Sequence, residues 1–261
     1  MSMHYCGWKF LAVLVLATGC ITNHDGEDKT VQMPQNIGVV KIYSEIDYHQ
    51  KKSGLNPVRW FTSDNEVDPP IVNGTGFLVN DMIVTAKHVI LGQAGLIAGE
   101  KSNNRTIRIR ISPYSYEPVA LWISPSSDLA AIKLKPDAVN ALNVKRFNAG
   151  RGAQQSEEVS AWGFPDTPSP DLCETSAKGG PLKITAVYND YLVLNGPIDG
   201  GFSGGPVVAR SDGALLGVIS RSEEKQTRVV RIHRLPTPDD FVEYSDNMKV
   251  SPDGQGFMAE Q

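Results

Sequence analysis

A serine within a glycine-rich turn is the first group in this sequence with evident chemical potential. Residues 199–206 read Asp-Gly-Gly-Phe-Ser-Gly-Gly-Pro, and an apolar run follows them. Glycine adopts positive φ without steric cost, so the turn can fix Ser203 and direct the backbone N–H groups of Gly201 and Ser203 at one oxygen. Such donors stabilise the negative charge that develops in acyl transfer by about 3–4 kcal/mol each. The alternative interpretation is a glycine-rich hairpin turn that carries a solvated serine.

A histidine and an aspartate stand at the ends of two other predicted strands. His88 follows the apolar strand expected at residues 82–85, and Asp128 precedes the apolar run 129–134. A histidine held at a rigid strand end is suited to act as a general base, and a carboxylate bonded to its ring N–H fixes the tautomer. Alone, each residue has a plainer role, as a histidine bonded to a carbonyl or an aspartate that caps a turn. With Ser203 they make the set that nucleophilic acyl transfer requires.

The segments that position these three residues are predicted to be short strands. Most are rich in β-branched residues or alternate with the period of two that one buried face produces, and Asn80-Asp81 favours a hairpin turn. Thr237 and Pro238 predict the start of a short helix, and residues 138–157 read as a linker. The strands are expected at residues 37–43, 77–79, 82–85, 106–111, 118–123, 129–134, 158–163, 182–187, 190–194, 206–209, 214–220 and 227–232.

The composition fits one catalytic domain and argues against several other kinds of protein. A chain of 261 residues with 41% hydrophobic content can bury one large core, and all-β domains of this size are often single units. Its 25 basic and 29 acidic residues give a net charge of −4 without a basic block, which argues against a nucleic-acid partner. The cysteines and histidines lack the spacing of tetrahedral ligands. We therefore expect no structural zinc site, and acyl transfer by Ser203, His88 and Asp128 needs no metal and no organic cofactor.

The N-terminus has the pattern of a secretory signal. The apolar run 10–17 is too short to span a bilayer and leads into Leu-Ala-Thr-Gly-Cys, which ends at Cys20. This ending resembles the lipobox of bacterial lipoproteins, which implies a signal peptide over residues 1–19, lipid on Cys20 and a polar tether over residues 20–35. Ile21 favours the outer membrane, facing the periplasm, as the location of the anchored protein in the cell envelope. The alternative is an ordinary signal peptide with a chance cysteine.

Histidine, aspartate and serine follow one another in the order of a known family. Together with their flanking residues they resemble the trypsin-like (chymotrypsin-fold) serine proteases, and among these the bacterial HtrA/Deg-like branch. The carrying segments are residues 74–78 (Gly-Thr-Gly-Phe-Leu), 84–89 (Val-Thr-Ala-Lys-His-Val), 127–130 (Ser-Asp-Leu-Ala) and 201–206 (Gly-Phe-Ser-Gly-Gly-Pro).

The resemblance implies an all-β fold of two packed six-stranded antiparallel β-barrels with a short C-terminal helix. The protease domain would span residues 36–245, and residues 246–261 would form a tail too short for the PDZ domain that many relatives carry. His88 and Asp128 would come from the first barrel and Ser203 from the second. The protein is then expected to be a membrane-anchored serine endopeptidase that acts on proteins or peptides. The alternatives are a catalytically silent binding module on the same scaffold and a scaffolding or adhesive lipoprotein of the envelope.

The resemblance also implies a specificity pocket with a wall and a floor. The two positions expected at the floor of the pocket, Pro197 and Ile198, are not acidic. A preference for substrates with arginine or lysine before the cleaved bond is therefore not supported, unless the Asp199 carboxylate points into the pocket. We expect a small or medium apolar side chain there instead. The wall is assigned to Ser220, Arg221 and Ser222, and the floor to Pro197 and Ile198.

Phe202 stands where activatable relatives have an aspartate that pairs with a new N-terminal amine. A phenyl ring cannot accept that ion pair. The sequence therefore predicts a site that forms without activating cleavage.

Overall fold

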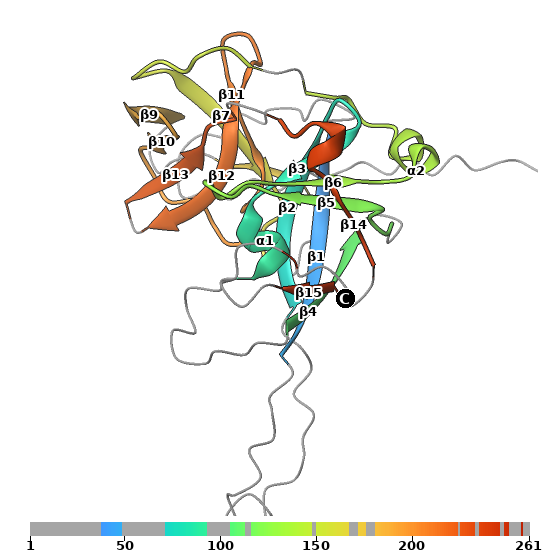
Figure 1. The fold of residues 1–261 in the computed structure, drawn as a ribbon. Helices are drawn as coiled ribbons and strands as arrows, with labels where there is room; N and C mark the ends of the chain where they lie inside the picture. The colour runs from blue at the N-terminus through green and yellow to red at the C-terminus, as the bar shows by residue number, and fades with distance from the viewer. Residues whose placement is uncertain are drawn as a thin grey trace, which may run out of the picture.

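Two antiparallel β-sheets lie side by side in the computed structural model of this protein (Figure 1). The structure describes residues 38–48, 71–92, 105–112, 116–147, 150–166, 172–175, 181–223, 225–232, 235–245, 248–250 and 257. The signal peptide, Cys20 and the tether predicted at the N-terminus lie outside these residues. None of the helices within them is long and apolar enough to cross a membrane.

The first sheet forms a half-barrel. Its strands are β1 (Val39–Tyr48), β2 (Ile71–Val79), β3 (Met82–Thr85), β4 (Arg105–Ile111), β5 (Ala120–Ile123), β6 (Ala130–Lys133), β14 (Val242–Glu243) and β15 (Met248–Val250). They pair in the order β14-β5-β6-β3-β2-β1-β4-β15. The central strands β2 and β3 therefore have a partner on both sides, and both lead to the candidate site.

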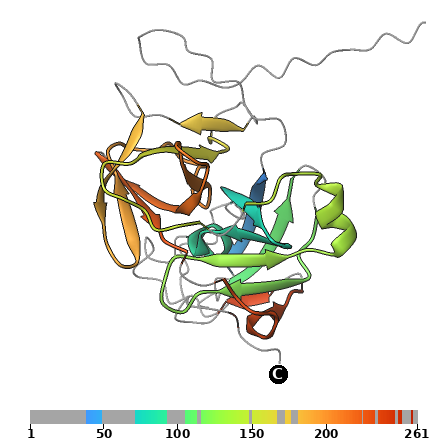
Figure 2. The same ribbon diagram turned by 90° about the horizontal axis from the view of Figure 1, so that it is seen from above.

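The second sheet closes into a six-stranded barrel. Its strands are β7 (Glu158–Gly163), β8 (Cys173–Thr175), β9 (Leu182–Val187), β10 (Tyr191–Leu194), β11 (Pro206–Ala209), β12 (Leu215–Glu223) and β13 (Gln226–Val230). The order is β11-β12-β13-β10-β9-β7-β8, and β11 also pairs with β7, which closes the ring and leaves β8 outside it. Figure 2 shows this barrel on the left and the first sheet on the right.

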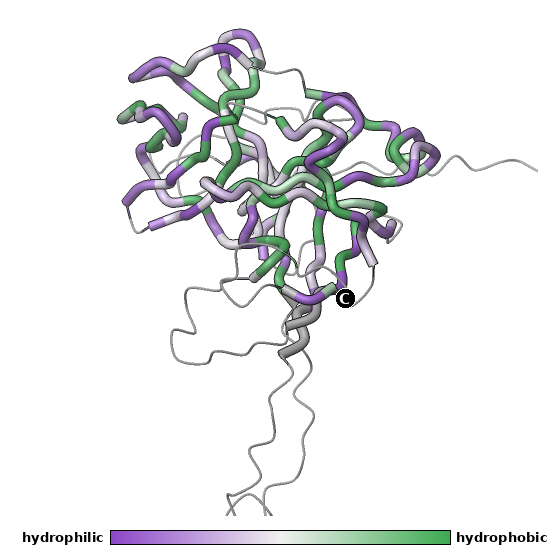
Figure 3. The backbone as a smooth tube through the Cα atoms, in the orientation of Figure 1, coloured by the Kyte–Doolittle hydropathy of each residue, from purple (hydrophilic) through white to green (hydrophobic). Residues whose placement is uncertain are grey.

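The sequence pattern of the strands explains which faces are buried. In β9, Leu182 and Ile184 are buried while Lys183 between them is exposed, as expected for a strand with one face in the core. All four residues of β11 are buried because both faces of the strand are covered. Val207 and Ala209 belong to the core of the second barrel, and Val208 packs in the cluster that contains the core of the first sheet. In Figure 3, hydrophobic stretches follow the strands and hydrophilic ones gather in the outer turns.

Short helices follow two of the strands in the first half of the chain. The first, α1 (Lys87–Leu91), starts two residues after β3 and buries its last three residues in the core. The second, α2 (Pro136–Ala141), has proline at its first position, where the missing N–H costs nothing. Beyond it, Phe147 returns to the first sheet and packs edge-on against Phe77, with ring centroids 5.4 Å apart. This contact anchors the linker between the sheets.

The predicted all-β class of two packed antiparallel barrels is confirmed, with some differences in detail. The second barrel has the expected six strands and is closed, whereas the first is an eight-stranded half-barrel. The expected C-terminal helix is a single 3₁₀ turn, Pro238–Asp240, after which the chain extends and pairs with β5 through β14. Part of the segment predicted as linker forms α2. The sequence also gave no indication of β8, β14 or β15, because strands of two or three residues show no periodicity.

Candidate active site

His88 is fixed by the rigid strand that precedes it and by the buried helix that contains it. Strand β3 pairs with β2 on one side and β6 on the other, so its end has little freedom to move. Helix α1 begins two residues later, where the Val89 N–H donates to the Ala86 carbonyl at 3.1 Å. The side chains of Val89 to Leu91 are buried, while the His88 side chain stays 19% exposed. The imidazole is therefore held in place and remains accessible.

Asp128 binds His88 through both of its carboxylate oxygens. Oδ2 lies 2.8 Å from the ring nitrogen Nδ1, and Oδ1 accepts a hydrogen bond of 3.0 Å from the His88 backbone N–H. The ring orientation is fixed because one carboxylate binds both the side chain and the main chain of the same residue. Nδ1 faces the carboxylate, which leaves Nε2 as the nitrogen available for proton transfer.

The loop before Asp128 is held by its own serines and by a lysine. The Ser124 backbone N–H donates to the Leu129 carbonyl at 2.9 Å, and the Ser127 backbone N–H donates to Ser124 Oγ at 3.2 Å. Lys87 Nζ donates to the Ser124 carbonyl at 2.9 Å. Because Lys87 is the neighbour of His88, this bond ties the aspartate loop directly to the helix that carries the imidazole.

The environment of Asp128 keeps its carboxylate ionised. Burial alone raises the pKa of Asp128, but the hydrogen bond and charge of His88 and the hydrogen bond from Ser220 together outweigh burial and lower it. Ser220 Oγ donates to Oδ2 at 2.5 Å. Since an ionised carboxylate stabilises an imidazolium beside it, the pair is suited to proton transfer at His88.

Ser203 lies in a tight turn packed against the end of β3. The Gly205 N–H donates to the Phe202 carbonyl at 2.9 Å, and Gly204 has φ of +85°, which is the signature of a type II turn. A Cβ on Gly204 would lie 2.1 Å from the Thr75 carbonyl oxygen, so only glycine fits. Among the described residues no hydrogen bond joins Ser203 Oγ to the His88 ring, a bond that is often long before substrate binds.

Two backbone N–H groups beside Ser203 are free to bind an oxyanion. The Asp166 N–H donates to the Gly200 carbonyl at 3.0 Å, and because a trans peptide directs its C=O and N–H to opposite sides, the Gly201 N–H points away from Asp166. Within the described part of the chain, neither this N–H nor that of Ser203 donates a hydrogen bond. Gly201 has φ of +86°, and a Cβ there would lie 2.1 Å from the Phe164 carbonyl oxygen.

Phe202, between these two residues, anchors the turn by packing. It is only 3% exposed and belongs to the core of the second barrel. Gly163 makes room for it, since a Cβ at that position would lie 2.6 Å from the phenyl ring. The turn is therefore seated in apolar surroundings and does not depend on a buried ion pair at this position.

The residues predicted to shape the specificity pocket differ in exposure. Ile198 is buried and its N–H donates to Ser222 Oγ at 2.8 Å, whereas Pro197 is exposed, as is Asp199. Arg221 is exposed, and Ser220 is bound to Asp128 as described above. Thr227 is not among the predicted site residues. Its hydroxyl donates to the Gly196 carbonyl at 2.8 Å and lies 3.3 Å from Ser222 Oγ. The pairing of β12 with β13 brings it there, and no local motif marks it.

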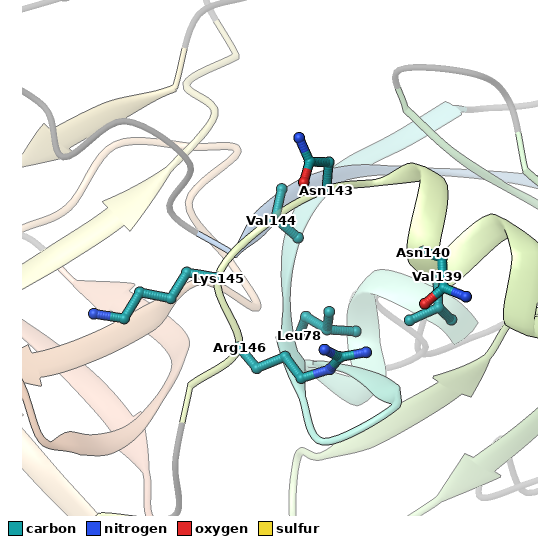
Figure 4. Close-up of a pocket in the computed structure, with 7 residues that line it drawn as sticks. All are labelled: Leu78, Val139, Asn140, Asn143, Val144, Lys145 and Arg146. Atoms are coloured by element: carbon teal, nitrogen blue, oxygen red, sulfur yellow. The ribbon is translucent and has the colours of Figure 1, made fainter.

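A separate surface hollow of about 340 Å³ near α2 contains none of the candidate catalytic residues (Figure 4). Leu78 and Val139 line it, and Arg146 at its edge is bonded to the Asn80 carbonyl and to Asp81. Lys145 points away from it. In the described residues no three side chains of His, Cys, Asp or Glu gather as a metal site.

A family model described as "Trypsin-like peptidase domain" matches residues 74–218, which is more than half of the chain. The chain belongs to the trypsin-like peptidase family. The matched range includes all three candidate catalytic residues. No curated protein matches the chain.

Two solved protease structures are similar to this chain. The active form of Rv3671c protease from M. tuberculosis is 20% identical over 76% of this chain and 77% of that chain, with a TM-score of 0.50. The serine endoprotease from Yersinia pestis is 20% identical over 75% of this chain and 59% of that chain, with a TM-score of 0.45. At these identities we take only the fold from the likeness, and for that we rely on the first structure.

Proposed function

We propose that this trypsin-like peptidase is a serine endopeptidase that cleaves proteins or peptides through an acyl-enzyme on Ser203. His88 accepts the hydroxyl proton as Ser203 Oγ bonds to the substrate carbonyl carbon, and the carbonyl electrons form an oxyanion held by the N–H groups of Gly201 and Ser203. His88 then protonates the leaving nitrogen as the C–N bond breaks. Water, deprotonated by His88, attacks the ester, and the acid leaves as the proton returns to Ser203 Oγ.

The observation that carries this proposal is the pair of contacts from the Asp128 carboxylate to the ring and the backbone N–H of His88. A histidine with a merely structural role needs one partner, and a bare carbonyl suffices. Here an ionised carboxylate fixes both the main chain and the ring, beside a serine that lies in a turn with two free N–H groups. This combination is what acyl transfer requires.

Labelling with a fluorophosphonate tests the proposal. The probe reacts only with a serine activated by its neighbours, so we expect one phosphonyl group on each wild-type chain and none on Ser203→Ala or His88→Ala. Ser211→Ala, which changes an exposed serine outside the site, is the matched control and should label like the wild type. A folded wild-type protein that takes up no label would favour a silent binding or scaffolding protein instead.

For specificity, the proposal is a small or medium apolar side chain before the cut. The apolar types of Pro197 and Ile198 at the expected floor support it, together with the hydrogen bond that holds the Ile198 N–H to Ser222 Oγ at 2.8 Å. A peptide library should yield cleavage after alanine, valine or similar residues. Cleavage mainly after arginine or lysine would contradict this.

The proposed location is the bacterial cell envelope, with lipid on Cys20 anchoring the domain to the outer membrane on its periplasmic side. Its support is the Leu-Ala-Thr-Gly-Cys ending of the signal segment. We expect the expressed full chain in the membrane fraction and Cys20→Ser in the soluble fraction. Equal distribution of the two proteins would contradict lipid anchoring while leaving the peptidase proposal untouched.

A further inference from the structure

Thr75 occupies the point where β2 of the first sheet meets the turn that carries Ser203. Thr75 is fully buried. It is the middle residue of the Gly-Thr-Gly segment, and its side chain has no part in the mechanism above. Its hydroxyl donates to the Gly201 carbonyl at 2.8 Å and accepts a hydrogen bond of 3.0 Å from the Phe164 N–H. One side chain thus joins two loops of the second barrel to a strand of the first.

The direction of both hydrogen bonds is settled by chemistry. A backbone N–H can only donate, and a carbonyl oxygen can only accept. The hydroxyl must therefore receive the hydrogen of Phe164 and direct its own hydrogen at Gly201. A β-branched residue in a strand also has few side-chain rotamers, so the hydroxyl is held in one position.

The main chain of Thr75 makes a second attachment to the same turn. Its N–H donates to the Ser203 carbonyl at 2.8 Å, and its own carbonyl accepts the Thr85 hydroxyl at 2.7 Å. A single residue of a central strand thereby holds the carbonyls of Gly201 and Ser203, which are the two residues whose N–H groups bind the oxyanion in the proposed mechanism. The attachments flank Phe202, so the backbone between them has little freedom to rotate.

We infer that Thr75 is a positioning residue that keeps the Gly201 and Ser203 N–H groups aimed at the oxyanion. The inference rests on the proposed function. Without the hydroxyl, the Gly201 carbonyl and the Phe164 N–H lose their hydrogen-bond partner at a buried position. Because an unpaired buried polar group costs free energy, each group is driven to rotate toward another hydrogen-bond partner. The Gly201 carbonyl and the Gly201 N–H belong to adjacent peptide units joined at the Gly201 Cα, so such a rotation changes the backbone dihedrals there and shifts the N–H relative to the oxyanion.

Thr75→Val tests this role because valine keeps the shape of threonine and removes only the hydroxyl. A displacement of about 1 Å at a reacting group costs on the order of 100-fold in rate. We expect kcat to fall about 100-fold with KM little changed, because the lost interaction forms only in the transition state. The affinity for a peptide aldehyde, which becomes an oxyanion on binding, should fall by the same factor. Thr75→Ser should recover most of both.

Fluorophosphonate labelling separates this effect from loss of folding. The labelling rate of Thr75→Val should fall while the end point stays at one group per chain, and Thr185→Val, which removes an exposed hydroxyl bonded to the Val193 carbonyl, should match the wild type. A Thr75→Val protein that labels and turns over at the wild-type rate would overturn the role of Thr75 alone, as would a fall in the end point without a fall in rate. A wild-type protein without label would overturn the proposed function and this inference together.

Discussion

Ser220 in β12 donates a hydrogen bond of 2.5 Å to Asp128, which stands before β6 in the other sheet. The carboxylate that orients His88 is therefore held from both halves of the molecule. The turn that carries Ser203 is also held across the two halves, since Ser203 belongs to the second barrel and its carbonyl accepts a hydrogen bond from the Thr75 N–H of the first sheet. The candidate site is complete only when the two sheets are docked in this register.

Ser220→Ala should weaken catalysis by loosening this link. The change removes one donor from a charged acceptor, a bond that contributes about 1.5–3 kcal/mol, so we expect kcat/KM to fall about 10-fold and the free energy of unfolding to fall by about 1–2 kcal/mol. The control is Ser160→Ala, because Ser160 is equally buried at 8% exposure. If both variants behave alike in peptide hydrolysis and urea unfolding, the bond to Asp128 has no special role.

The lowered pKa of Asp128 predicts how stability responds to acid. A carboxyl whose folded pKa lies below its unfolded value of about 3.9 adds stability that is fully present above that value and is lost as the pH falls through the folded pKa. Urea unfolding from pH 7 to pH 2 should therefore show the wild type losing its advantage over Asp128→Asn below about pH 4. A difference that stays constant, or grows, as the pH falls would contradict the cause given for the shift.

Substitutions at two glycines with positive φ distinguish the cost of backbone strain from the cost of a steric clash. Gly204 and Gly213 have φ of +85° and +71°, but a Cβ on Gly204 would lie 2.1 Å from the Thr75 carbonyl oxygen, whereas one on Gly213 meets nothing within 4 Å. Gly213→Ala should cost about 1–2 kcal/mol of unfolding free energy and leave labelling intact. Gly204→Ala should cost about 3 kcal/mol or more and abolish labelling. Similar losses in both variants would mean that the packing around Gly204 is less tight than described.

The burial of Phe202 in the apolar core of the second barrel predicts activity without proteolytic activation. The domain should label with fluorophosphonate at its full mass, and Phe202→Leu should retain labelling because the replacement is also apolar. Phe202→Asp would bury a carboxylate without a partner and should unfold the turn. Labelling that begins only after a cut within residues 38–245 would show that the site forms by activation.

The three candidate catalytic residues could be predicted because each stands at the end of a strand, within a local motif. The contacts that position them could not. The hydroxyl of Thr75 meets partners 89 and 126 positions away in the sequence, and Thr227 reaches Gly196 only through the register of β12 and β13. Such contacts depend on how the sheets dock, and a single sequence carries no local sign of that.

The sequence predicts where the C-terminal helical turn begins but not where it ends. Thr237 and Pro238 correctly mark a helical start, and the Thr237 N–H donates to the Asp240 carboxylate at 2.6 Å. The helix ends after one turn because Val242 pairs with Leu121 of β5, and this tertiary contact outweighs local propensity. For α2, where a linker is predicted from residue 138 onward, Pro136 at the first helical position is the local signal of the helix.

Cleavage of an unstructured protein such as casein tests the central claim most directly. Incubation with the wild-type domain, followed by mass spectrometry of the products, should reveal new peptide ends at a limited set of internal bonds, with small or medium apolar residues before the cuts. Ser203→Ala, with the same midpoint of thermal unfolding as the wild type, should yield no new peptide ends. Equal cleavage by the two proteins, or no cleavage by a wild-type protein that labels fully with fluorophosphonate, would contradict the assignment of this chain as a serine endopeptidase acting through Ser203.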